Sequence, residues 1–497
     1  MRLSKVIAGT GASLGRAPDA EVSLVTADSR LVKPGALFVA VPGTRADGAS
    51  FAPAAARAGA VAVLAERPVE CSPATLLVVP SARRALAVAA ANLHGHPGER
   101  LLLCGVTGTK GKTTVTYLLE ACATAAGLSA GVVGTVNVRL PGRILPASHT
   151  TPDAAELQAH LAVMADAGVR IAILEVSSHA LDQERSAGLG FRAAGFTNLG
   201  RDHLDYHPDV ESYFQAKRRL FTEGLAPDGV AVVNAADGHG ARLAEELRAA
   251  GRTVWCTGIP GAEISARDVV AGIEGIRAVL VTPRGEVPVT SPLVGAHNRE
   301  NLEVAAGLAL ALGIPASAVS AGLSSSRGAP GRLERIDGHG VSAFVDYAHT
   351  PDSLAAACAA LRGLSPRRLL VVFGCGGDRD RGKRPLMGRA AGLAADLVVV
   401  TSDNPRTEDP RAILAAIVPG VEEAGVARLS REEAVAGRSG FVVEEDRRVA
   451  IALALAAARP GDAVLVAGKG HEGYQIVGTE RLPFDDREEA RRGLGAA

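Results

Sequence analysis

Residues 101–114 read LLLCGVTGTKGKTT. A run of apolar residues is followed by a glycine-rich turn and then by residues that can begin a helix, which predicts a strand, a loop and a helix in that order. Backbone N–H groups of such a loop and the positive end of the following helix together form a cradle for phosphate. This segment therefore predicts a nucleotide-binding α/β domain.

Within this loop, Lys112 is expected to reach the β- and γ-phosphates of ATP, and the Thr113 hydroxyl is expected to bind Mg²⁺. The loop differs from that of GTPases and ATP synthases, because the position five residues before Gly111 is Val106 and the glycine is Gly105 instead. The predicted ATP-binding residues of the loop are Gly108, Thr109, Lys110, Gly111, Lys112, Thr113 and Thr114.

Strands and helices alternate on both sides of this loop, which predicts α/β domains with parallel sheets covered on both faces. Breaks in the pattern near residues 96–98 and 324–328 predict three domains, at 1–98, 99–327 and 328–497. The predicted strands are residues 36–41, 61–65, 76–79, 101–106, 171–176, 230–234, 343–346, 368–373, 395–400 and 463–467, the predicted helices are 51–58, 81–93, one from about 112 and one over 298–312, and short strands with turns are predicted over 262–289.

The composition excludes several classes of protein. Hydrophobic residues make up 47% of the 497 residues and charged residues 21%, so the chain can form several cores and is not disordered. Lys+Arg and Asp+Glu both number 53, and this balance argues against a partner that is nucleic acid or an anionic membrane. The beginning of the sequence lacks the apolar core of a signal peptide, and no apolar run is long enough to span a bilayer. Six scattered cysteines without a C-x-x-C pair are typical of reduced thiols, so we expect a cytoplasmic protein without membrane insertion.

Lysine is scarce in this chain, since only seven of the 53 basic residues are lysines. Five of the seven fall in motifs with candidate functional residues, at Lys110, Lys112, Lys217, Lys383 and Lys469.

Glu175 lies at the carboxyl end of a predicted strand, where side chains of doubly wound sheets face the ligand crevice. It is a candidate Mg²⁺ ligand because Mg²⁺ prefers oxygen donors, and a helix-capping role is the alternative. Residues 197–207, TNLGRDHLDYH, form a polar segment that contains His203. A structural loop is the alternative interpretation of this segment. Lys217 follows His203 by fourteen residues, and a lone lysine at such a position is most often a surface charge.

The motif G-T-x-G-K-T-T resembles the loop of the Mur ligases and of their folylpolyglutamate synthase relatives, which join a carboxylate to an amine with ATP. The resemblance extends along nearly the whole chain and is greatest to the Mur ligases that add the third residue of the peptidoglycan stem peptide. It implies a UDP-sugar-binding domain, a central ATP-binding domain and a Rossmann-like amino-acid-binding domain. The segments that carry it are 28–30 (DSR), 37–43 (LFVAVPG), 295–298 (GAHN), 331–334 (GRLE) and 346–351 (DYAHTP).

The resemblance implies that Lys217 is carbamylated by CO₂ and, with His203, organises one of two Mg²⁺ ions, while Glu175 and Thr113 hold the other. An ammonium group cannot ligate a cation, whereas a carbamate presents two anionic oxygens. Thr44 and Arg45 stand where some relatives carry other polar residues that contact uridine. The resemblance also places Asn301, Arg332 and Asp346 near ATP, and Ser29, Thr150, Thr151, Ser177, Gln183 and Arg185 at the muramoyl-dipeptide substrate.

Two segments of the third domain bear on the amino acid that is added. Residues 374–380 read GCGGDRD, which lacks the spacing of a dinucleotide-binding motif. Residues 403–406 read DNPR, the form that this family has in ligases adding meso-diaminopimelate, whose distal carboxylate the Arg406 guanidinium can bind with two parallel hydrogen bonds. The resemblance assigns Arg379, Asp403, Asn404, Pro405, Arg406, Gly468 and Glu472 to diaminopimelate.

The predicted reaction is the ATP-dependent addition of meso-2,6-diaminopimelate to UDP-N-acetylmuramoyl-L-alanyl-D-glutamate (UDP-MurNAc-L-Ala-D-Glu) through an acyl phosphate, by an enzyme that we expect to be a monomer. Three alternatives are addition of L-lysine instead, a folylpolyglutamate synthase-like ligase, and a P-loop ATPase or nucleotide-gated binding module without ligase activity. The last explains residues 108–114 but neither Lys217 nor residues 403–406.

Overall fold

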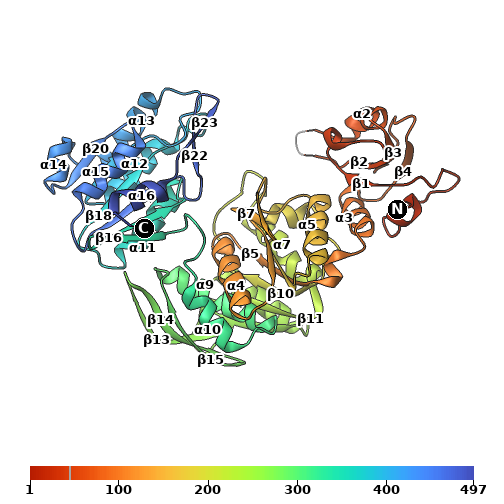
Figure 1. The fold of residues 1–497 in the computed structure, drawn as a ribbon, viewed down its shortest axis with the longest axis horizontal. Helices are drawn as coiled ribbons and strands as arrows, with labels where there is room; N and C mark the ends of the chain where they lie inside the picture. The colour runs from red at the N-terminus through yellow and green to blue at the C-terminus, as the bar shows by residue number, and fades with distance from the viewer. Residues whose placement is uncertain (44–45, 497) are drawn as a thin grey trace. The chain divides into compact units, whose positions relative to one another are not determined.

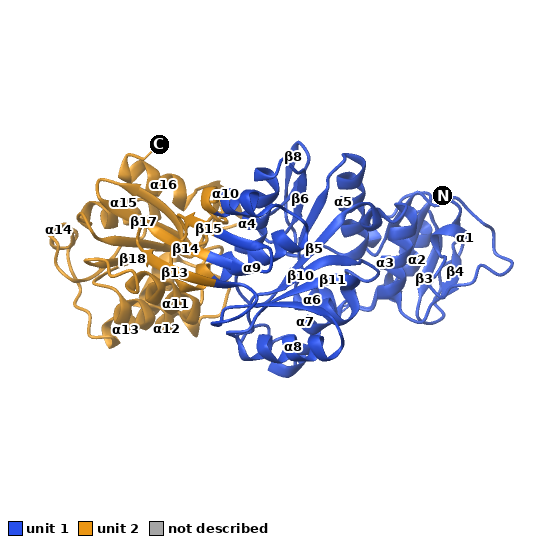
Figure 2. Ribbon diagram, turned by 90° about the horizontal axis from the view of Figure 1, so that it is seen from below, with its two compact units in different colours: residues 1–265, 280–287, 300–323 blue, residues 266–279, 288–299, 324–497 orange. Residues whose placement is uncertain are grey.

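The computed structural model describes residues 1–43 and 46–496, so Thr44 and Arg45, which the sequence placed near uridine, lie outside the described residues. The chain runs through alternating helices and strands, as predicted (Figure 1). It falls into two compact units (Figure 2): unit 1 comprises residues 1–265, 280–287 and 300–323, and unit 2 comprises residues 266–279, 288–299 and 324–497. The three-domain boundaries at residues 98 and 327 stay predictions.

The N-terminal part of unit 1 is a four-stranded parallel sheet with the strand order β1-β2-β3-β4. Its buried core includes Ala154 at the start of α5, and Ala155 and Ala187 also pack against it. The core is therefore continuous with the elements that follow it. The elements are β1 (Leu24–Thr26), β2 (Ala36–Val39), α2 (Ala52–Arg57), β3 (Ala60–Ala65), β4 (Thr75–Val78) and α3 (Ala82–Leu93), and the following segment contains α5 (Ala154–Asp166).

The central sheet of unit 1 has eight strands in the order β12-β11-β10-β5-β9-β6-β7-β8. The six strands from β12 to β6 pair in parallel, and the phosphate loop leaves the carboxyl end of β5, between β9 and β10. The strands are β5 (Leu102–Thr107), β6 (Ala130–Val133), β7 (Asn137–Leu140), β8 (Arg143–Pro146), β9 (Ile171–Glu175), β10 (Phe191–Phe196), β11 (Leu225–Asn234) and β12 (Thr253–Thr257). The helices are α4 (Lys112–Ala125), α6 (Ser178–Asp182), α7 (Val210–Arg219), α8 (Gly238–Ala249), α9 (Ala296–Ala311) and α10 (Ala316–Ser325).

Two details differ from the sequence prediction. β7 and β8 extend the central sheet as antiparallel strands, so the sheet is parallel only in part. Ser324 and Ser325, predicted as linker, complete the last turn of α10. The short strands predicted over 262–289 form a separate three-stranded sheet of β13 (Ser265–Gly272), β14 (Gly275–Thr282) and β15 (Gly285–Ser291).

Unit 2 contains a six-stranded sheet in the order β16-β17-β21-β18-β19-β20, parallel except for β16. Alternate residues of β18 enter two different cores, Leu369 and Val371 on one face and Leu370 and Val372 on the other, so the sheet is buried on both faces. The elements are β16 (Glu334–Gly338), β17 (Val341–Asp346), α11 (Pro351–Arg362), β18 (Leu369–Phe373), α12 (Lys383–Ala394), β19 (Leu397–Val400), α13 (Pro410–Glu423), α14 (Arg431–Val435), β20 (Gly440–Val443), α15 (Arg447–Ala457), β21 (Ala463–Ala467), the hairpin β22 (Tyr474–Val477) and β23 (Glu480–Pro483), and α16 (Asp486–Leu494).

Candidate active site

Glycine is required at two positions of the phosphate loop. Gly108 has φ +141°, and a Cβ atom there would lie 1.9 Å from Thr197 Oγ1. Gly111 has φ +89°, and a Cβ atom there would lie 2.4 Å from Asn301 Oδ1. The loop thus packs closely against the segment after β10 and against α9, and this brings Asn301 to the loop although almost 190 residues separate them in the sequence.

We predict that Gly111→Ala weakens ATP binding by about tenfold to a hundredfold in KM, because the new Cβ displaces Asn301 and forces a strained φ. Gly127→Ala is the matched control, since Gly127 follows the same helix with φ +69° and open space around its Cβ position. The control lowers stability but leaves the KM for ATP unchanged. Equal KM values for ATP in both variants would contradict the prediction.

Backbone and side-chain hydrogen bonds hold the loop against residues 197–200. The Lys110 N–H donates to Asn198 Oδ1 at 2.9 Å, and Thr197 Oγ1 donates to the Lys110 carbonyl at 2.6 Å. Lys112 extends back over the loop, where its Nζ donates to the carbonyls of Gly108 (2.8 Å) and Thr109 (3.0 Å). The ammonium of Lys112 therefore lies over the loop itself, where the phosphates are expected.

Glu175 is buried at the end of β9 and accepts hydrogen bonds from two threonine hydroxyls. Thr113 Oγ1 donates to its Oε2 at 2.9 Å and Thr135 Oγ1 donates to the same atom at 2.8 Å, while the Thr135 N–H donates to Oε1 at 3.0 Å. A Cβ atom on Gly134 would lie 2.4 Å from Oε1. The carboxylate therefore lies beside the first turn of α4 and is joined to the loop, and it does not cap a helix.

Lys217 lies on α7 and is only 1% exposed. Asp209 caps this helix by accepting the Ser212 N–H, and the helix directs the Lys217 amine to the Gly108 carbonyl, which it meets at 2.8 Å. Its Nζ also lies 4.4 Å from the centre of the Tyr213 ring. Burial, together with the positive charge of Lys112, lowers the pKa of Lys217 well below its ordinary value, which favours the neutral amine.

The Tyr213 ring beside this lysine belongs to a cluster of aromatic rings. His203 lies with its ring centre 4.9 Å from that of His179 and 5.9 Å from that of Tyr213, and His207 lies 5.2 Å from Tyr213. Tyr213 also shares a 3.1 Å hydrogen bond with the Thr109 hydroxyl of the phosphate loop. Burial is the largest cause of a lowered pKa at His203 and at His207. His179 is lowered to a pKa of about 4 by burial and by the neighbouring charges of His203, His207 and Arg185.

These lowered pKa values predict that the protein loses stability in mild acid. His179 is neutral in the folded chain down to about pH 4, whereas the unfolded chain takes up that proton near pH 6.5. The unfolded state then binds more protons, so stability falls as the pH drops from about 6.5 towards 4. Thermal unfolding at pH 7 and pH 5 measures this, and His179→Gln reduces the difference in Tm. Replacing the exposed His149 with Gln serves as the control, and an equal reduction there would refute the assignment to His179.

Five of the six residues predicted to hold the dipeptide belong to one hydrogen-bonded group beside Glu175, and the sixth, Ser29, lies apart from it. Thr151 Oγ1 donates to the Glu175 carbonyl at 2.8 Å, and the Ser177 N–H donates to Thr151 Oγ1 at 3.1 Å. The Arg185 guanidinium donates to the Thr151 carbonyl (2.6 Å) and to Gln183 Oε1 (2.8 Å). The Thr150 hydroxyl lies 3.1 Å from that of Thr135. Ser29 lies in a short 3₁₀ turn of the N-terminal sheet region.

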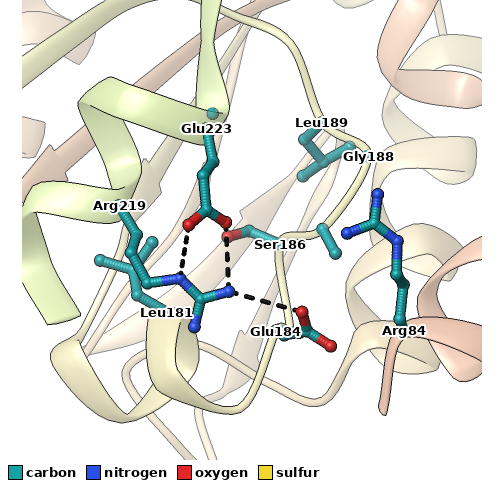
Figure 3. Close-up of a pocket in the computed structure, with 10 residues that line it drawn as sticks. Arg84, Leu181, Glu184, Ser186, Gly188, Leu189, Arg219 and Glu223 are labelled. Atoms are coloured by element: carbon teal, nitrogen blue, oxygen red, sulfur yellow. Dashed lines mark hydrogen bonds and ion pairs between the residues drawn. The ribbon is translucent and has the colours of Figure 1, made fainter. Parts of the chain in front are cut away.

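A pocket at the end of α7 is lined by Arg219 of this helix and by Arg84 of the N-terminal region, among other residues (Figure 3). The Arg219 guanidinium lies between two carboxylates there, 2.9 Å from Glu223 Oε1 and 3.4 Å from Glu184 Oε1 (Figure 3). The Ser81 hydroxyl donates to the other oxygen of Glu184 at 3.2 Å. Because Lys217 precedes Arg219 by two residues, these contacts hold the end of the helix that carries the buried amine.

In unit 2, four neighbouring strands end at the residues predicted to bind the amino acid and ATP. The four strands lie in the sheet order β17-β21-β18-β19. β17 ends at Asp346, Gly468 follows β21, Gly374 follows β18, and the segment after β19 leads to Asp403. Carboxyl ends of adjacent parallel strands form the usual ligand crevice of such sheets. The predicted residues of unit 2 are therefore brought together although they span more than 120 positions.

The G-C-G-G segment packs against the DNPR turn. A Cβ atom on Gly377 would lie 1.8 Å from the Pro405 carbonyl, and one on Gly376 would lie 2.9 Å from Arg406 Nη1. The Gly377 N–H donates to the Asn404 carbonyl at 2.9 Å, and Arg406 Nη1 donates to the Gly377 carbonyl at 2.8 Å. The glycines thus permit close approach of the turn that carries Arg406.

The hairpin β22–β23 was not predicted from the sequence, and it also holds this turn. Arg406 has φ +52°, its N–H donates to the Ile476 carbonyl at 3.1 Å, and its carbonyl accepts the Gly478 N–H at 2.7 Å. Gln475 Nε2 donates to the Asp403 carbonyl at 2.6 Å. The four-residue strands are too short for an alternation pattern, so the sequence carried no clear signal for them.

The remaining predicted residues of unit 2 have these surroundings. Asp346 accepts the N–H groups of Leu333 and Ala348, each at 2.8 Å. The Arg332 guanidinium lies 4.8 Å from the centre of the Tyr347 ring. Arg379 Nη1 donates to the carbonyl of the preceding residue at 3.2 Å. Arg332 and Asp346 belong to unit 2 and Asn301 to unit 1, so the three do not form one group within a single unit.

Several side chains at the site were not predicted. Thr135 is the second residue after β6, which pairs in parallel with the strand that ends at Glu175, and this position just beyond a strand end is the signal that could have found it. Tyr213 and His207 fell inside or beside quoted motifs, but only the fold shows that their rings lie around Lys217.

No described helix has both the length and the apolar character needed to cross a membrane.

Known proteins resemble this chain along almost its full length. The Mur ligase family catalytic domain matches residues 21–94, the Mur ligase middle domain matches 106–309 and the Mur ligase glutamate ligase domain matches 331–470. The UDP-N-acetylmuramoyl-L-alanyl-D-glutamate–2,6-diaminopimelate ligase of Gloeobacter violaceus is 49% identical over 99% of this chain and 98% of that protein. The ligase of the same name from Geobacter metallireducens is 46% identical over 94% of this chain and 93% of that protein. A solved structure of a ligase with this name has a TM-score of 0.71 and 35% identity, and the match covers 96% of each chain.

Proposed function

Because this chain belongs to the Mur ligase family, we propose that it joins meso-2,6-diaminopimelate to UDP-MurNAc-L-Ala-D-Glu at the expense of ATP. It has the three-domain α/β architecture of the family and is an amide-bond-forming, ATP-dependent ligase of peptidoglycan synthesis. The structural observation that carries the proposal is the buried amine of Lys217 at 2.8 Å from a carbonyl of the phosphate loop, whose following helix binds the buried carboxylate of Glu175 through Thr113. The relatives that add diaminopimelate favour this reaction over the lysine-adding and folylpolyglutamate synthase alternatives.

The residues around the loop fit the two Mg²⁺ ions and the lysine carbamate that the family resemblance implies. Glu175 and the Thr113 hydroxyl present oxygen atoms where the loop enters α4, and Lys217 meets the Gly108 carbonyl of the loop, with the His203 ring near that of Tyr213. Among the described residues, no three His, Cys, Asp or Glu side chains form a metal-binding group. The hydroxyl, the carbamate and the phosphates of ATP would therefore supply the further oxygen donors that Mg²⁺ prefers. When bound, Mg²⁺ neutralises charge on the phosphates and makes the γ-phosphorus more electrophilic.

The side chains of this enzyme mainly position the reactants. The backbone N–H groups of the loop and Lys112 bind the phosphates of ATP, and Lys112 exchanges its contacts with the Gly108 and Thr109 carbonyls for phosphate oxygens. Arg185 and the Thr151–Ser177 pair lie beside Glu175, where they can hold the D-glutamyl end of the dipeptide. This places a carboxylate next to the γ-phosphate.

The reaction then proceeds in two displacements. The carboxylate oxygen attacks the γ-phosphorus and ADP leaves, which gives an acyl phosphate. The neutral amine of diaminopimelate attacks the acyl carbon, phosphate leaves with the electron pair of the C–O bond, and the amine loses a proton. Asp403, Asn404, Arg406 and Glu472 orient the amino acid for this second step, and positioning of this kind supplies a large part of the catalysis in bimolecular reactions.

We further propose that the enzyme acts in the cytoplasm, where ATP and UDP-linked precursors are available, and that it serves cell shape and cell division through peptidoglycan. Its six cysteines are buried and free, which agrees with a reducing compartment.

Phosphate release distinguishes the proposed function from its rivals. With ATP and UDP-MurNAc-L-Ala-D-Glu, phosphate is released when diaminopimelate is added and much more slowly when L-lysine is added. Turnover that does not depend on the dipeptide would refute the ligase. Equal turnover with L-lysine would refute the amino-acid assignment and leave the ligase intact.

A further inference from the structure

Lys469 is a fully buried lysine at the amino-acid site, and the proposed reaction does not by itself assign it a role. It is the second residue after the end of β21, and its side chain is 0% exposed. Its Nζ donates to Asn404 Oδ1 at 2.8 Å and to Asp403 Oδ1 at 3.4 Å, and it lies 3.7 Å from Glu472 Oε2. An ammonium group has three N–H donors. The three acceptors thus come from the two segments that the resemblance assigns to diaminopimelate.

These contacts determine which way round the Asn404 amide lies. Asn404 Oδ1 accepts both Lys469 Nζ and the Ile476 N–H (2.9 Å), so its Nδ2 must point the other way. Nδ2 donates to Glu472 Oε2 at 3.0 Å. The same Glu472 oxygen therefore faces both Lys469 and Asn404. Both contacts hold this one oxygen, and neither involves the second oxygen of Glu472.

A second buried cation lies beneath the same two segments. The Arg447 guanidinium binds both carboxylate oxygens of Asp486 at 2.7 Å, and both side chains are 0% exposed. It also donates to the carbonyls of Ser402 (3.2 Å) and Ala467 (2.9 Å), the residues that immediately precede Asp403 and Gly468. Arg447 therefore ties together the strand ends from which the two segments begin.

The charged side chains around Lys469 and Arg447 carry more negative than positive charges. Lys469 and Arg447 supply two positive charges, and Asp403, Glu472 and Asp486 supply three negative charges. Buried charges are stabilised by pairing, and an excess charge is neutralised by a ligand of opposite sign. Arg406 on the same turn as Asp403 adds a third positive charge, so once a substrate carboxylate pairs with Arg406, one carboxylate of the group is left for one substrate ammonium group.

We infer that Lys469 is a positioning residue for the amino-acid substrate, which orients Asn404 and Glu472 so that the pocket accepts one substrate ammonium group beside the Arg406 guanidinium. This inference rests on the proposed function, because it assigns Lys469 to the same amino-acid site. Lys469 itself is covered by its partners and does not touch the substrate. Its loss leaves two carboxylates without their shared cation and frees the Asn404 amide to rotate.

The test is Lys469→Met, with Lys469→Arg as the variant that retains the charge. Steady-state kinetics with meso-diaminopimelate, UDP-MurNAc-L-Ala-D-Glu and ATP varied separately give the three KM values. In Lys469→Met, we expect the KM for diaminopimelate to rise at least tenfold, while the KM values for ATP and for the dipeptide substrate change less than twofold. Lys469→Arg recovers part of the loss. If the Met variant does not fold, Lys469→Gln, which also lacks the charge, is measured in its place.

Arg368→Met is the control for loss of a largely buried, ion-paired cation, since the Arg368 side chain is 13% exposed. Arg368 lies just before the start of β18, at the opposite end of the same sheet, where it binds Asp462 at 2.6 Å and the Ala457 carbonyl at 2.7 Å. We expect the Arg368→Met substitution to lower Tm and to leave all three KM values unchanged. An unchanged KM for diaminopimelate in Lys469→Met, or an equal rise for all three substrates, would overturn the inference. A wild-type enzyme that does not use diaminopimelate at all would instead refute the proposed function.

Discussion

Lys217→Ala lowers the ligation rate by at least about a thousandfold, which corresponds to roughly 4 kcal/mol of transition-state stabilisation. The reason is that the variant can carry neither an amine nor a carbamate at the carbonyl of Gly108, where the wild-type amine lies 2.8 Å away. Lys217→Arg is expected to be equally inactive, because a guanidinium keeps the positive charge but does not form a carbamate. The measurement is phosphate release with all three substrates present.

Two observations separate the carbamate from a structural role of this lysine. The wild-type peptide containing Lys217 is heavier by one CO₂ under conditions that preserve carbamates, and added short carboxylic acids such as acetate restore part of the activity of Lys217→Ala. Lys33→Ala, which removes an exposed lysine of the N-terminal region, is the control and retains full activity. A fully active Lys217→Ala enzyme would refute the assignment.

Arg406→Ala is expected to have the second largest effect, and it acts on one substrate only. The KM for meso-diaminopimelate rises by about a hundredfold, because the distal carboxylate loses two charge-assisted hydrogen bonds. Each of these bonds contributes up to about 1.5–3 kcal/mol of binding free energy. L-Lysine has no such carboxylate, so its weak use is unchanged or improves, and discrimination between the two amino acids falls. Arg406→Lys restores little, since a single ammonium cannot form the paired contact.

The control for Arg406 is Arg381→Ala, which removes a guanidinium from the neighbouring loop. Arg381 is 75% exposed and lies 3.2 Å from Glu408, so its loss leaves the KM for diaminopimelate unchanged. A comparable loss with L-lysine and with diaminopimelate in Arg406→Ala would show that Arg406 maintains the turn through the Gly377 carbonyl rather than recognising the distal carboxylate.

The sequence was sufficient for the elements with a strong local pattern. The strands before the phosphate loop and before Glu175 are continuous apolar runs, and both form buried parallel strands. Neighbouring strands of one parallel sheet end at the same edge, which explains why the loop and Glu175 meet. The antiparallel strands β7 and β8 have four residues each, too few to show an alternation, and so the mixed character of the sheet was not predicted.

The parts that the sequence could not supply depend on contacts between distant segments. Nothing local to Gly111 shows that Asn301 fills the space where a Cβ would lie. Likewise, the orientation of Asn404 follows from Lys469 and from a hairpin backbone about seventy residues away. Burial of Lys217 is also a property of the fold, because a single lysine in a polar helix gives no sign of it.

The core of the N-terminal sheet continues into the start of α5, so the two parts of unit 1 that it joins are held at a set distance from each other. Ala154 of α5 belongs to the N-terminal core, and Thr150 and Thr151 come shortly before α5. Glu184 forms a second connection, because it contacts both Ser81 of the N-terminal region and Arg219 at the end of α7. If the uridine end is held in the N-terminal sheet region, the reacting carboxylate can reach the phosphate loop only when the glycopeptide between them has the right length. Under that condition, a precursor with one residue fewer would be bound by its nucleotide while its carboxylate stops short of the γ-phosphate.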